Sequence, residues 1–432
     1  MEVIGVIVLA GTFFLLLLLG VPISFCIGIS TISTMLLSIK AAPALTTVAQ
    51  RMATGLDSFA LLAIPFFILS GQLMNRGGIA RRLIDFAKTL VGMLPGGLAY
   101  VNILACMLFG AISGSAVAAS AAIGGFMIPL MNKEGYDKNF SAAVNITSST
   151  TGLVIPPSNI LIVYSLASGG VSIAALFLAG YIPGMIVGFA LMTVAGVFSY
   201  KRGYPTAGAV SLREGIARFL DALPSLFLLV IVIGGIIAGY FTATEASAVA
   251  VFYTFVLSVF IYREIRWKEI PGILIDSSTT TAIVMLLIGT SIGMSWIMSY
   301  ENIPQNVSAT LMSLTENKIV ILLIINVILL LVGTFMDMTP AVLIFTPIFL
   351  PVVIQLGMDP IHFGIIMVLN LCVGLCTPPV GSVLFVGCGI ANTTVVKVIR
   401  PLLPLFIAMI VSLLLITYLP QLSLALPRFF GY

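Results

Sequence analysis

The stretch "GLVIPPSNI" (residues 152–160) places two adjacent prolines inside a long apolar run, and "GLCTPPVGS" (residues 374–382) repeats this 222 positions later (374 − 152). Proline has no N–H, so it deprives the carbonyl four residues earlier of its helical hydrogen bond. Residues before a proline also avoid helical backbone angles. The prolines Pro156, Pro157, Pro378 and Pro379 therefore predict two broken helices, with extended backbone at Ile155 and Thr377 and unpaired carbonyls at Gly152, Leu153, Gly374 and Leu375.

The composition indicates whether these broken helices lie in water or in a membrane. The chain has 432 residues, of which 60% are hydrophobic and 8% are charged. A soluble domain carries about 25% charged residues, so most of this surface must face lipid. The net charge of +4 lies in loops, which gives no indication of nucleic-acid binding. The N-terminal apolar stretch lacks a basic start and a small-residue cleavage site, so it is expected to be a retained first span.

Runs of about 20 apolar residues predict membrane-spanning helices. The continuous candidates are 3–20, 22–39, 57–75, 173–199, 223–241, 245–262, 277–299 and 401–419, and the proline pairs lie in two further crossings, 140–170 and 361–392. Two more regions, 98–131 and 319–357, are interrupted at "GAISGSA" (110–116) and "GTFMDMTP" (333–340). Their halves of about 12 to 17 residues are short for a crossing, so each region is predicted to be a re-entrant hairpin.

The basic residues support this interpretation. If 98–131 returns to its own side, the clusters at 76–88, 133–138, 201–218, 263–268 and 397–400 all fall on one face. The positive-inside rule makes that face cytoplasmic. Lys40 and Arg51 are exceptions, because they are expected on the outer side.

The spacing of the motifs predicts two inverted repeats, each with about five crossings, one of them broken, and one hairpin. The first repeat is predicted at 1–200, with a hairpin entering from the cytoplasm, and the second at 223–432, with a hairpin entering from outside. A cytoplasmic amphipathic linker is expected at 201–222. Inverted repeats with broken helices are typical of secondary transporters, whose binding sites lie near the middle of the membrane.

Unpaired carbonyls within a bilayer cost several kcal/mol each unless something satisfies them, and Na⁺ is a cation that oxygen ligands would bind. Hydroxyl and carboxylate groups at the hairpin tips are natural complements, and tip glycines allow close backbone approach. The structural alternative is a pair of kinks whose carbonyls bind neighbouring Ser or Thr hydroxyls. The predicted sodium-binding residues are Gly110, Ser113, Ser115, Gly152, Ile155, Pro156, Gly333, Thr334, Asp337, Gly374, Thr377 and Pro378.

Asp337 is the acidic residue expected deepest in the membrane, where a charge costs a few kcal/mol and a functional role is the default interpretation. The alternative is that Asp337 caps the following half-helix, and the two roles are compatible. In contrast, Thr242 and Glu245 fit a capping box. Specificity for the solute is expected to come from hydroxyls and amides near the breaks, with Asp337, at Asn145, Ser148, Ser149, Ser158 and Asn370.

Several motifs resemble those of the large membrane subunit of tripartite ATP-independent periplasmic (TRAP) transporters. They are "LDSFALLAIPFFILSGQLMN", "GAISGSAVAASAAIGGFMIPLM", "GLVIPPSN", "FTATEASA", "GTFMDMTPAVLIFTPIFLP" and "GIIMVLNLCVGLCTPPVGSVLF", in the family's order over nearly the whole chain. Ala243 departs from the pattern, since the family more often has proline there.

The resemblance implies a Na⁺-driven, elevator-type importer of organic anions, such as C4-dicarboxylates or sialic acids, in the bacterial inner membrane. It implies two partners, a small four-helix membrane subunit and a periplasmic solute-binding protein. One Na⁺ would lie between "SGS" and "GLVIPP" and another between "GTFMD" and "GLCTPP". In an elevator the hairpins and broken helices move together, and the remaining spans form a fixed scaffold.

Three other functions compete with this one. A stand-alone Na⁺/carboxylate symporter would use similar hairpins without a binding protein. A channel is disfavoured because hairpins from opposite faces suit alternating access. An enzyme is not expected, because the sequence offers no recognisable catalytic group and no ATP-binding loop.

Overall fold

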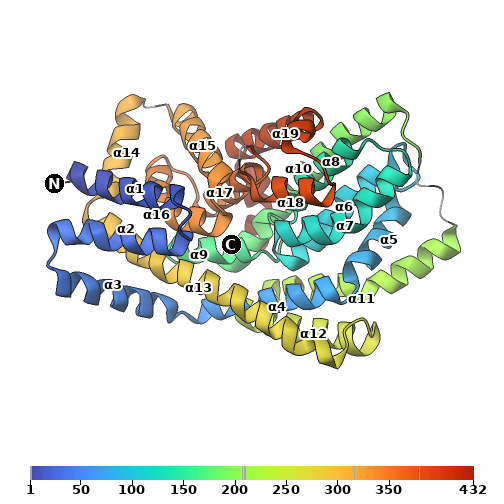
Figure 1. Ribbon diagram of the computed structural model, residues 1–432, viewed down its shortest axis with the longest axis horizontal. Coiled ribbons are helices and arrows are strands. Elements are labelled where there is room, and N and C mark those ends of the chain that lie inside the picture. Colours follow the sequence, from blue (N-terminus) through green and yellow to red (C-terminus); the bar gives the residue numbers. More distant parts are fainter. Residues whose placement is uncertain (1, 207, 209–210, 316, 379) are drawn as a thin grey trace.

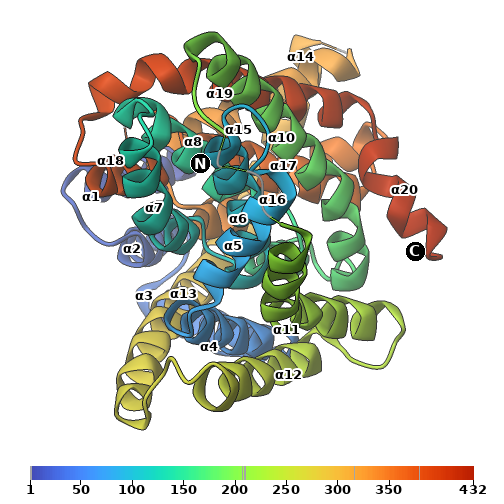
Figure 2. The same ribbon diagram turned by 90° about the vertical axis from the view of Figure 1, so that its right-hand side faces the viewer.

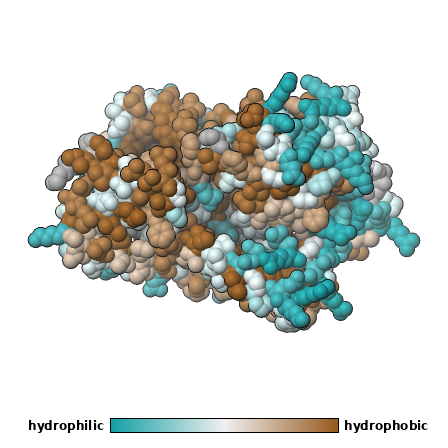
Figure 3. Space-filling model, viewed as in Figure 1, coloured by the Kyte–Doolittle hydropathy of each residue, from teal (hydrophilic) through white to brown (hydrophobic). Residues whose placement is uncertain are grey.

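The computed structural model describes residues 2–206, 208, 211–315, 317–378 and 380–432. Within these ranges the chain is helical and contains no strand (Figure 1). Nine helical segments in the described ranges are long and apolar enough to span a membrane. Hydrophobic residues cover most of the left half of the surface in Figure 3, and hydrophilic residues gather toward the right. The prediction of an all-α polytopic membrane protein is confirmed.

The first half of the described chain contains α1 (Glu2–Leu18), α2 (Ile23–Ser38), α3 (Ala41–Leu56), η1 (Phe59–Leu62), α4 (Ala63–Arg76), α5 (Ile79–Val91), α6 (Gly97–Ser113), α7 (Ala116–Lys133), α8 (Lys138–Thr151), α9 (Asn159–Ala167) and α10 (Ile173–Arg202). The second half contains α11 (Leu212–Ile237), α12 (Ala243–Val256), η2 (Leu257–Ile261), η3 (Trp267–Glu269), α13 (Ile270–Tyr300), α14 (Ile303–Leu314), α15 (Lys318–Phe335), α16 (Met338–Gln355), α17 (Pro360–Gly374), α18 (Ser382–Ile390), α19 (Val395–Tyr418) and α20 (Gln421–Phe429).

Elements of the two halves correspond in position. The starts of α7 and α16 are 222 residues apart (338 − 116), as are those of α8 and α17 (360 − 138) and those of α10 and α19 (395 − 173). Local details follow the same spacing. Gly135 and Gly357 both have positive φ, +84° and +71°. Asp137 and Asp359 each cap the next helix, accepting a hydrogen bond from a backbone N–H of its first turn.

Both interrupted regions form helical hairpins. α6 packs against α7, and α15 against α16. Gly114 ends α6 in a left-handed conformation, with φ +62°, that an L side chain rarely adopts. The arms have 17 or 18 residues, slightly longer than the predicted 12 to 17.

The broken helices run from α8 to α9 and from α17 to α18, but two of the predicted unpaired carbonyls have partners. The carbonyl of Leu153 accepts a hydrogen bond from the Ser158 hydroxyl (2.5 Å). The carbonyl of Gly374 accepts one from the backbone N–H of Thr377 (2.9 Å), because the helix tightens to an i→i+3 turn before Pro378. The prediction for these two carbonyls was wrong. Pro379 lies outside the described residues.

The helices divide into two groups. α4, α12 and α13 lie together in the lower part of Figures 1 and 2, and α10, α15, α17 and α19 lie in the upper part. α10 packs on α6 and α19, and α19 packs on α8. α10 and α19 therefore cover the broken helix of the first half.

Four helices were not predicted as separate elements, and the last of them, α20, packs on α10 and α17. α3 packs along α13 and precedes α4, while α5 and α14 connect the lower group to the hairpins. The predicted linker 201–222 is also shorter than expected. α10 continues to Arg202 and α11 begins at Leu212, because the Ser211 hydroxyl caps α11 at the N–H of Glu214.

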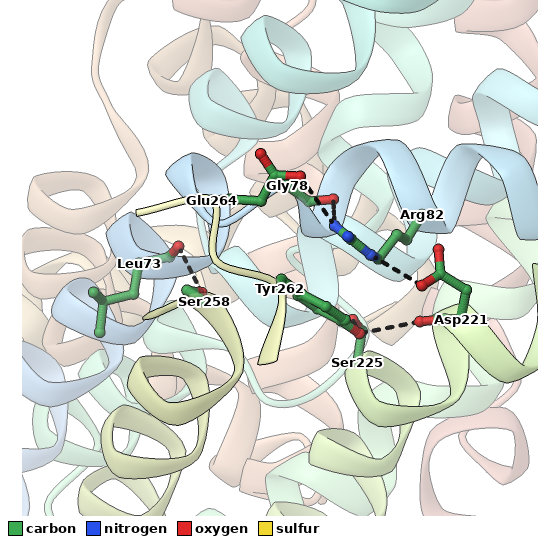
Figure 4. Close-up of polar contacts among 8 residues, drawn as sticks. All are labelled: Leu73, Gly78, Arg82, Asp221, Ser225, Ser258, Tyr262 and Glu264. Carbon is green, nitrogen blue, oxygen red and sulfur yellow. Dashed lines mark hydrogen bonds and ion pairs between the residues drawn. The ribbon is translucent and has the colours of Figure 1, made fainter. Parts of the chain in front are cut away.

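The amphipathic α5 is held to the lower group by Arg82 (Figure 4). Its guanidinium donates to the Asp221 carboxylate on α11 (3.3 Å) and lies over the Tyr262 ring, 3.7 Å from its centroid. Burial raises the pKa of the Tyr262 hydroxyl, which donates to the Asp221 carbonyl (3.0 Å). These contacts connect α5, which packs on α6 of the first hairpin, to α11 and to Tyr262 just after η2.

Candidate functional site

A cavity of about 260 Å³ lies where the two hairpin tips meet α4, α9 and α13. The first tip contributes Ser113, Gly114 and Ser115, and the second contributes Asp337. Thus the tips, more than 200 residues apart in sequence, face one chamber. Ser113, Ser115 and Asp337 are the sequence-predicted site residues that line it.

Three helices begin at this cavity. The first turn of α7 (Ala116–Lys133), of α16 (Met338–Gln355) and of α9 (Asn159–Ala167) each contributes lining residues. Backbone N–H groups in the first turn of a helix have no helical partner, and the helix dipole places partial positive charge there. Three N-termini directed at one small chamber favour an anionic group inside it.

Asp337 adds a negative charge to the same chamber. It occupies the N-cap position of α16, but its side chain makes no capping hydrogen bond. The carboxylate is exposed and has no ion-pair partner among the described residues. Ser115 holds the corresponding position in the first hairpin (337 − 115 = 222), and its hydroxyl does cap α7, accepting from the N–H of Ala118 (3.2 Å).

Sequence reasoning missed several polar residues of the lining. Gln72 and Asn75 are one helical turn apart on α4, and Thr280 lies on α13. Asn159 begins α9, with its amide nitrogen 2.9 Å from the point where a Cβ on Gly114 would lie. Asn159 had a usable signal, because it lies two residues after the first proline pair.

Four of the predicted sodium-site glycines form two matching backbone crossings. A Cβ on Gly152 would lie 2.4 Å from the Cα of Gly110, and a Cβ on Gly374 would lie 2.6 Å from the Cα of Gly333. Each break therefore rests directly on the hairpin of its own half. The Gly152 carbonyl accepts no hydrogen bond from the described residues, so it is available to a cation at the first crossing.

The other predicted residues near the crossings lie outside the cavity lining. Ile155 packs against Gly184 on α10, and Pro156 lies near Gly180. The Thr334 hydroxyl donates to the Leu331 carbonyl (2.7 Å) and the Thr377 hydroxyl to the Val373 carbonyl (2.8 Å). Pro378 follows in the second break. The structure thus places these residues beside the crossings rather than at the cavity.

The predicted substrate residues other than Asp337 also do not line the cavity. The Asn145 amide donates to the carbonyl and hydroxyl of Ser120, and the Asn370 amide donates to the backbone and side-chain oxygens of Asn326. Ser148 and Ser149 donate to carbonyls within α8. These groups, together with Ser158, bond within the helical framework that supports the breaks.

Comparison with known proteins agrees with this architecture. Residues 10–422 match the family described as "Tripartite ATP-independent periplasmic transporter, DctM component". The chain is 39% identical to the C4-dicarboxylate TRAP transporter large permease protein DctM of Rhodobacter capsulatus, over 98% of this chain and 99% of that protein. It is 43% identical to the isethionate TRAP transporter permease protein DctMQ of Oleidesulfovibrio alaskensis, over 98% of this chain and 66% of that protein.

Among solved structures, the YdaH transporter of Alcanivorax borkumensis superimposes with a TM-score of 0.65 at 14% identity, covering 91% of each chain. This likeness concerns the fold alone. The family match over nearly the whole chain and the identity to the DctM permeases lead to one conclusion. The chain belongs to the DctM component family of tripartite ATP-independent periplasmic transporters.

Proposed function

We propose that this chain, a permease of a family of secondary transporters of small organic anions, imports its anion together with Na⁺ across the bacterial inner membrane. The observation that carries the proposal is the cavity between the hairpin tips. It combines three helix N-termini, which favour an anion, with the unpaired carboxylate of Asp337, which favours a cation.

The opposite preferences explain why the two solutes would be coupled. Two like charges 4 Å apart repel by about 4 kcal/mol at an effective dielectric constant of 20. An organic anion near Asp337 is therefore disfavoured until a cation neutralises the carboxylate. Na⁺ suits this place, because the oxygens that line the cavity include a carboxylate and the hydroxyls of Ser113 and Ser115.

We infer an inverted arrangement of the two halves and an elevator motion of the hairpins, with Ser113, Ser115, Gly110 and Gly152 at one Na⁺ site. Asp337, Gly333, Thr334 and Gly374 belong to the second. The two matching glycine crossings support this assignment, since each break and its hairpin are in direct backbone contact and would move as one unit.

The partners are a small four-helix membrane subunit and a periplasmic solute-binding protein. The isethionate relative is named DctMQ, and this chain covers 66% of it, which is consistent with a large and a small permease part joined in one chain. The solute is a small organic anion of the C4-dicarboxylate, sialic acid or sulfonate type.

The test is uptake in proteoliposomes that contain this chain and its small subunit. Radiolabelled succinate, N-acetylneuraminate and isethionate are offered with the matching binding protein, with an inward Na⁺ gradient or an equal K⁺ gradient. We expect saturable uptake of one of them that requires both Na⁺ and the binding protein. Uptake without the binding protein would instead identify a stand-alone Na⁺/carboxylate symporter, and equal uptake in K⁺ would refute Na⁺ coupling.

A further inference from the structure

A second cavity, of about 370 Å³, lies between the two groups of helices. One wall is formed by α3 and α13, and the other by the C-terminal end of α9 and the middle of α16 (Figure 1). Arg51, Ser291, Ser295 and Trp296 face it from the first wall, and Leu166 and Leu343 from the second. The polar groups used below therefore all come from α3 and α13.

Arg51 is the cation of this cavity. Its guanidinium carbon lies 5.7 Å from the centroid of the Trp296 ring, which orients it through a cation–π contact. Arg51 is exposed and makes no ion pair with any described residue. An arginine positioned in this way offers several N–H donors to an anion.

Ser291 supplies an independent indication of a ligand. Its side chain is 2% exposed, and its hydroxyl has no hydrogen-bond partner. Neighbouring hydroxyls on the same helix are paired, since Thr290 donates to the Leu286 carbonyl and Ser299 to the Ser295 carbonyl. An unsatisfied buried hydroxyl costs about 1–3 kcal/mol, which a polar ligand in the adjoining cavity would remove.

The cavity lies far from the basic face of the molecule. α13 begins at Ile270, close to the ion pair of Arg76 with Asp276. Trp296 is 26 residues further along, which at about 1.5 Å per residue is roughly 39 Å. This exceeds the ~30 Å hydrocarbon thickness of a bilayer. Arg51 is thus at the opposite, outer membrane face. It is an exception to the positive-inside rule, which places most basic residues on the cytoplasmic face.

We propose that this second cavity is an outer waiting site for the transported anion, which binds Arg51 through a carboxylate or sulfonate and Ser291 through a polar atom. The proposal rests on the proposed function. The wall formed by α3 and α13, which carries Arg51, would remain fixed. α9 and α16, whose first turns line the cavity between the hairpin tips, would move with the elevator. The anion would then be held at the outer face until the tip cavity becomes accessible.

Trp296 provides a direct readout of binding. The chain has two tryptophans, so Trp267→Phe leaves Trp296 as the single indole beside Arg51. The purified complex with the small subunit is titrated with succinate, N-acetylneuraminate and isethionate at constant ionic strength, with chloride as the reference anion. We expect a saturable change in emission with one organic anion. It should disappear in Arg51→Gln, weaken in Ser291→Ala and persist in Lys40→Gln, which removes another exposed outer cation.

This titration needs neither a Na⁺ gradient nor uptake, so it separates the waiting site from the proposed function. The site is refuted if Arg51→Gln retains the saturable change or if no anion of the panel causes one. A change produced by phosphatidylglycerol nanodiscs but not by the free anions would assign the cavity to a lipid phosphate and also refute the site. In uptake assays, Arg51→Gln should raise KM about tenfold or more with kcat unchanged, the loss expected for a charge-assisted hydrogen bond.

Discussion

Asp337 shows how far a single residue can be assigned from sequence. Its place at the "GTFMDMTP" interruption predicted a hairpin-tip carboxylate, and the structure puts it in the lining of the tip cavity without an ion pair to any described residue. Ser158 shows the limit. Its hydroxyl binds the Leu153 carbonyl, a contact five residues back that depends on the local path of the chain through the break. The spacing of the prolines fixes which N–H groups are missing, but not which side chains replace them.

Asp337→Asn should impair Na⁺ coupling with little effect on folding. The amide keeps the shape of the side chain and removes the charge, and no ion pair with a described residue depends on the carboxylate. We expect the Na⁺ concentration for half-maximal uptake to rise about tenfold or more, equivalent to losing ~1.4 kcal/mol of cation binding. Asp276→Asn is the matched control, because that carboxylate is exposed and pairs with Arg76. An unchanged Na⁺ dependence in Asp337→Asn would show that this carboxylate does not contribute to the cation site.

At the scale of elements, the hairpins and breaks were predictable because small residues and proline pairs mark them directly. α5 and α14 were not, because they are short and less apolar than a span. α5 carries the pattern "IARRLIDFAKTLV", whose apolar face becomes visible only when its packing partners are known. The packing partners of α10 and α19 were also not predictable, since their hydrophobicity gives no indication of which apolar surface they cover.

The close approach of Gly110 and Gly152 allows a prediction about the contact between α6 and the end of α8. Gly152→Ala places a methyl group 2.4 Å from the Cα of Gly110. Because this neighbour is a backbone atom, the backbone of α6 or of the break must move to make room. Overpacking of this kind costs about 1–3 kcal/mol. Because Gly152 has φ −63°, backbone strain does not contribute. The variant should unfold several degrees below the wild type when its thermal stability is followed in detergent.

Gly125→Ala is the control for this contact. Gly125 lies within α7, and a Cβ there would have no atom within 4 Å, so alanine should be neutral or stabilising. If both variants unfold at the same temperature, the close crossing does not exist in the membrane protein. Normal folding of Gly152→Ala with lost uptake would instead indicate that the crossing matters for the cation site rather than for stability.

On the scale of the whole molecule, the repeat could be predicted from spacing because the same offset recurs in the motifs and in the helices. The orientation of each half is defined relative to the bilayer, so contacts between residues do not determine it. It rests on the odd number of crossings per half and on the distribution of basic residues. The bases of the two hairpins therefore provide the decisive comparison, since an inverted arrangement places them on opposite faces.

Single cysteines at Glu134, at the base of the first hairpin, and at Lys318, at the base of the second, test the arrangement. Both positions are exposed, and the five native cysteines are buried, so an impermeant maleimide should report the new thiols. In right-side-out vesicles we expect Lys318→Cys to be labelled and Glu134→Cys to be protected, with the opposite result in inside-out vesicles. Labelling of both from one side would exclude inverted repeats. Because both hairpin tips line the same cavity, labelling from opposite sides would mean that the two tips approach that cavity from opposite membrane faces, the geometry that alternating access requires.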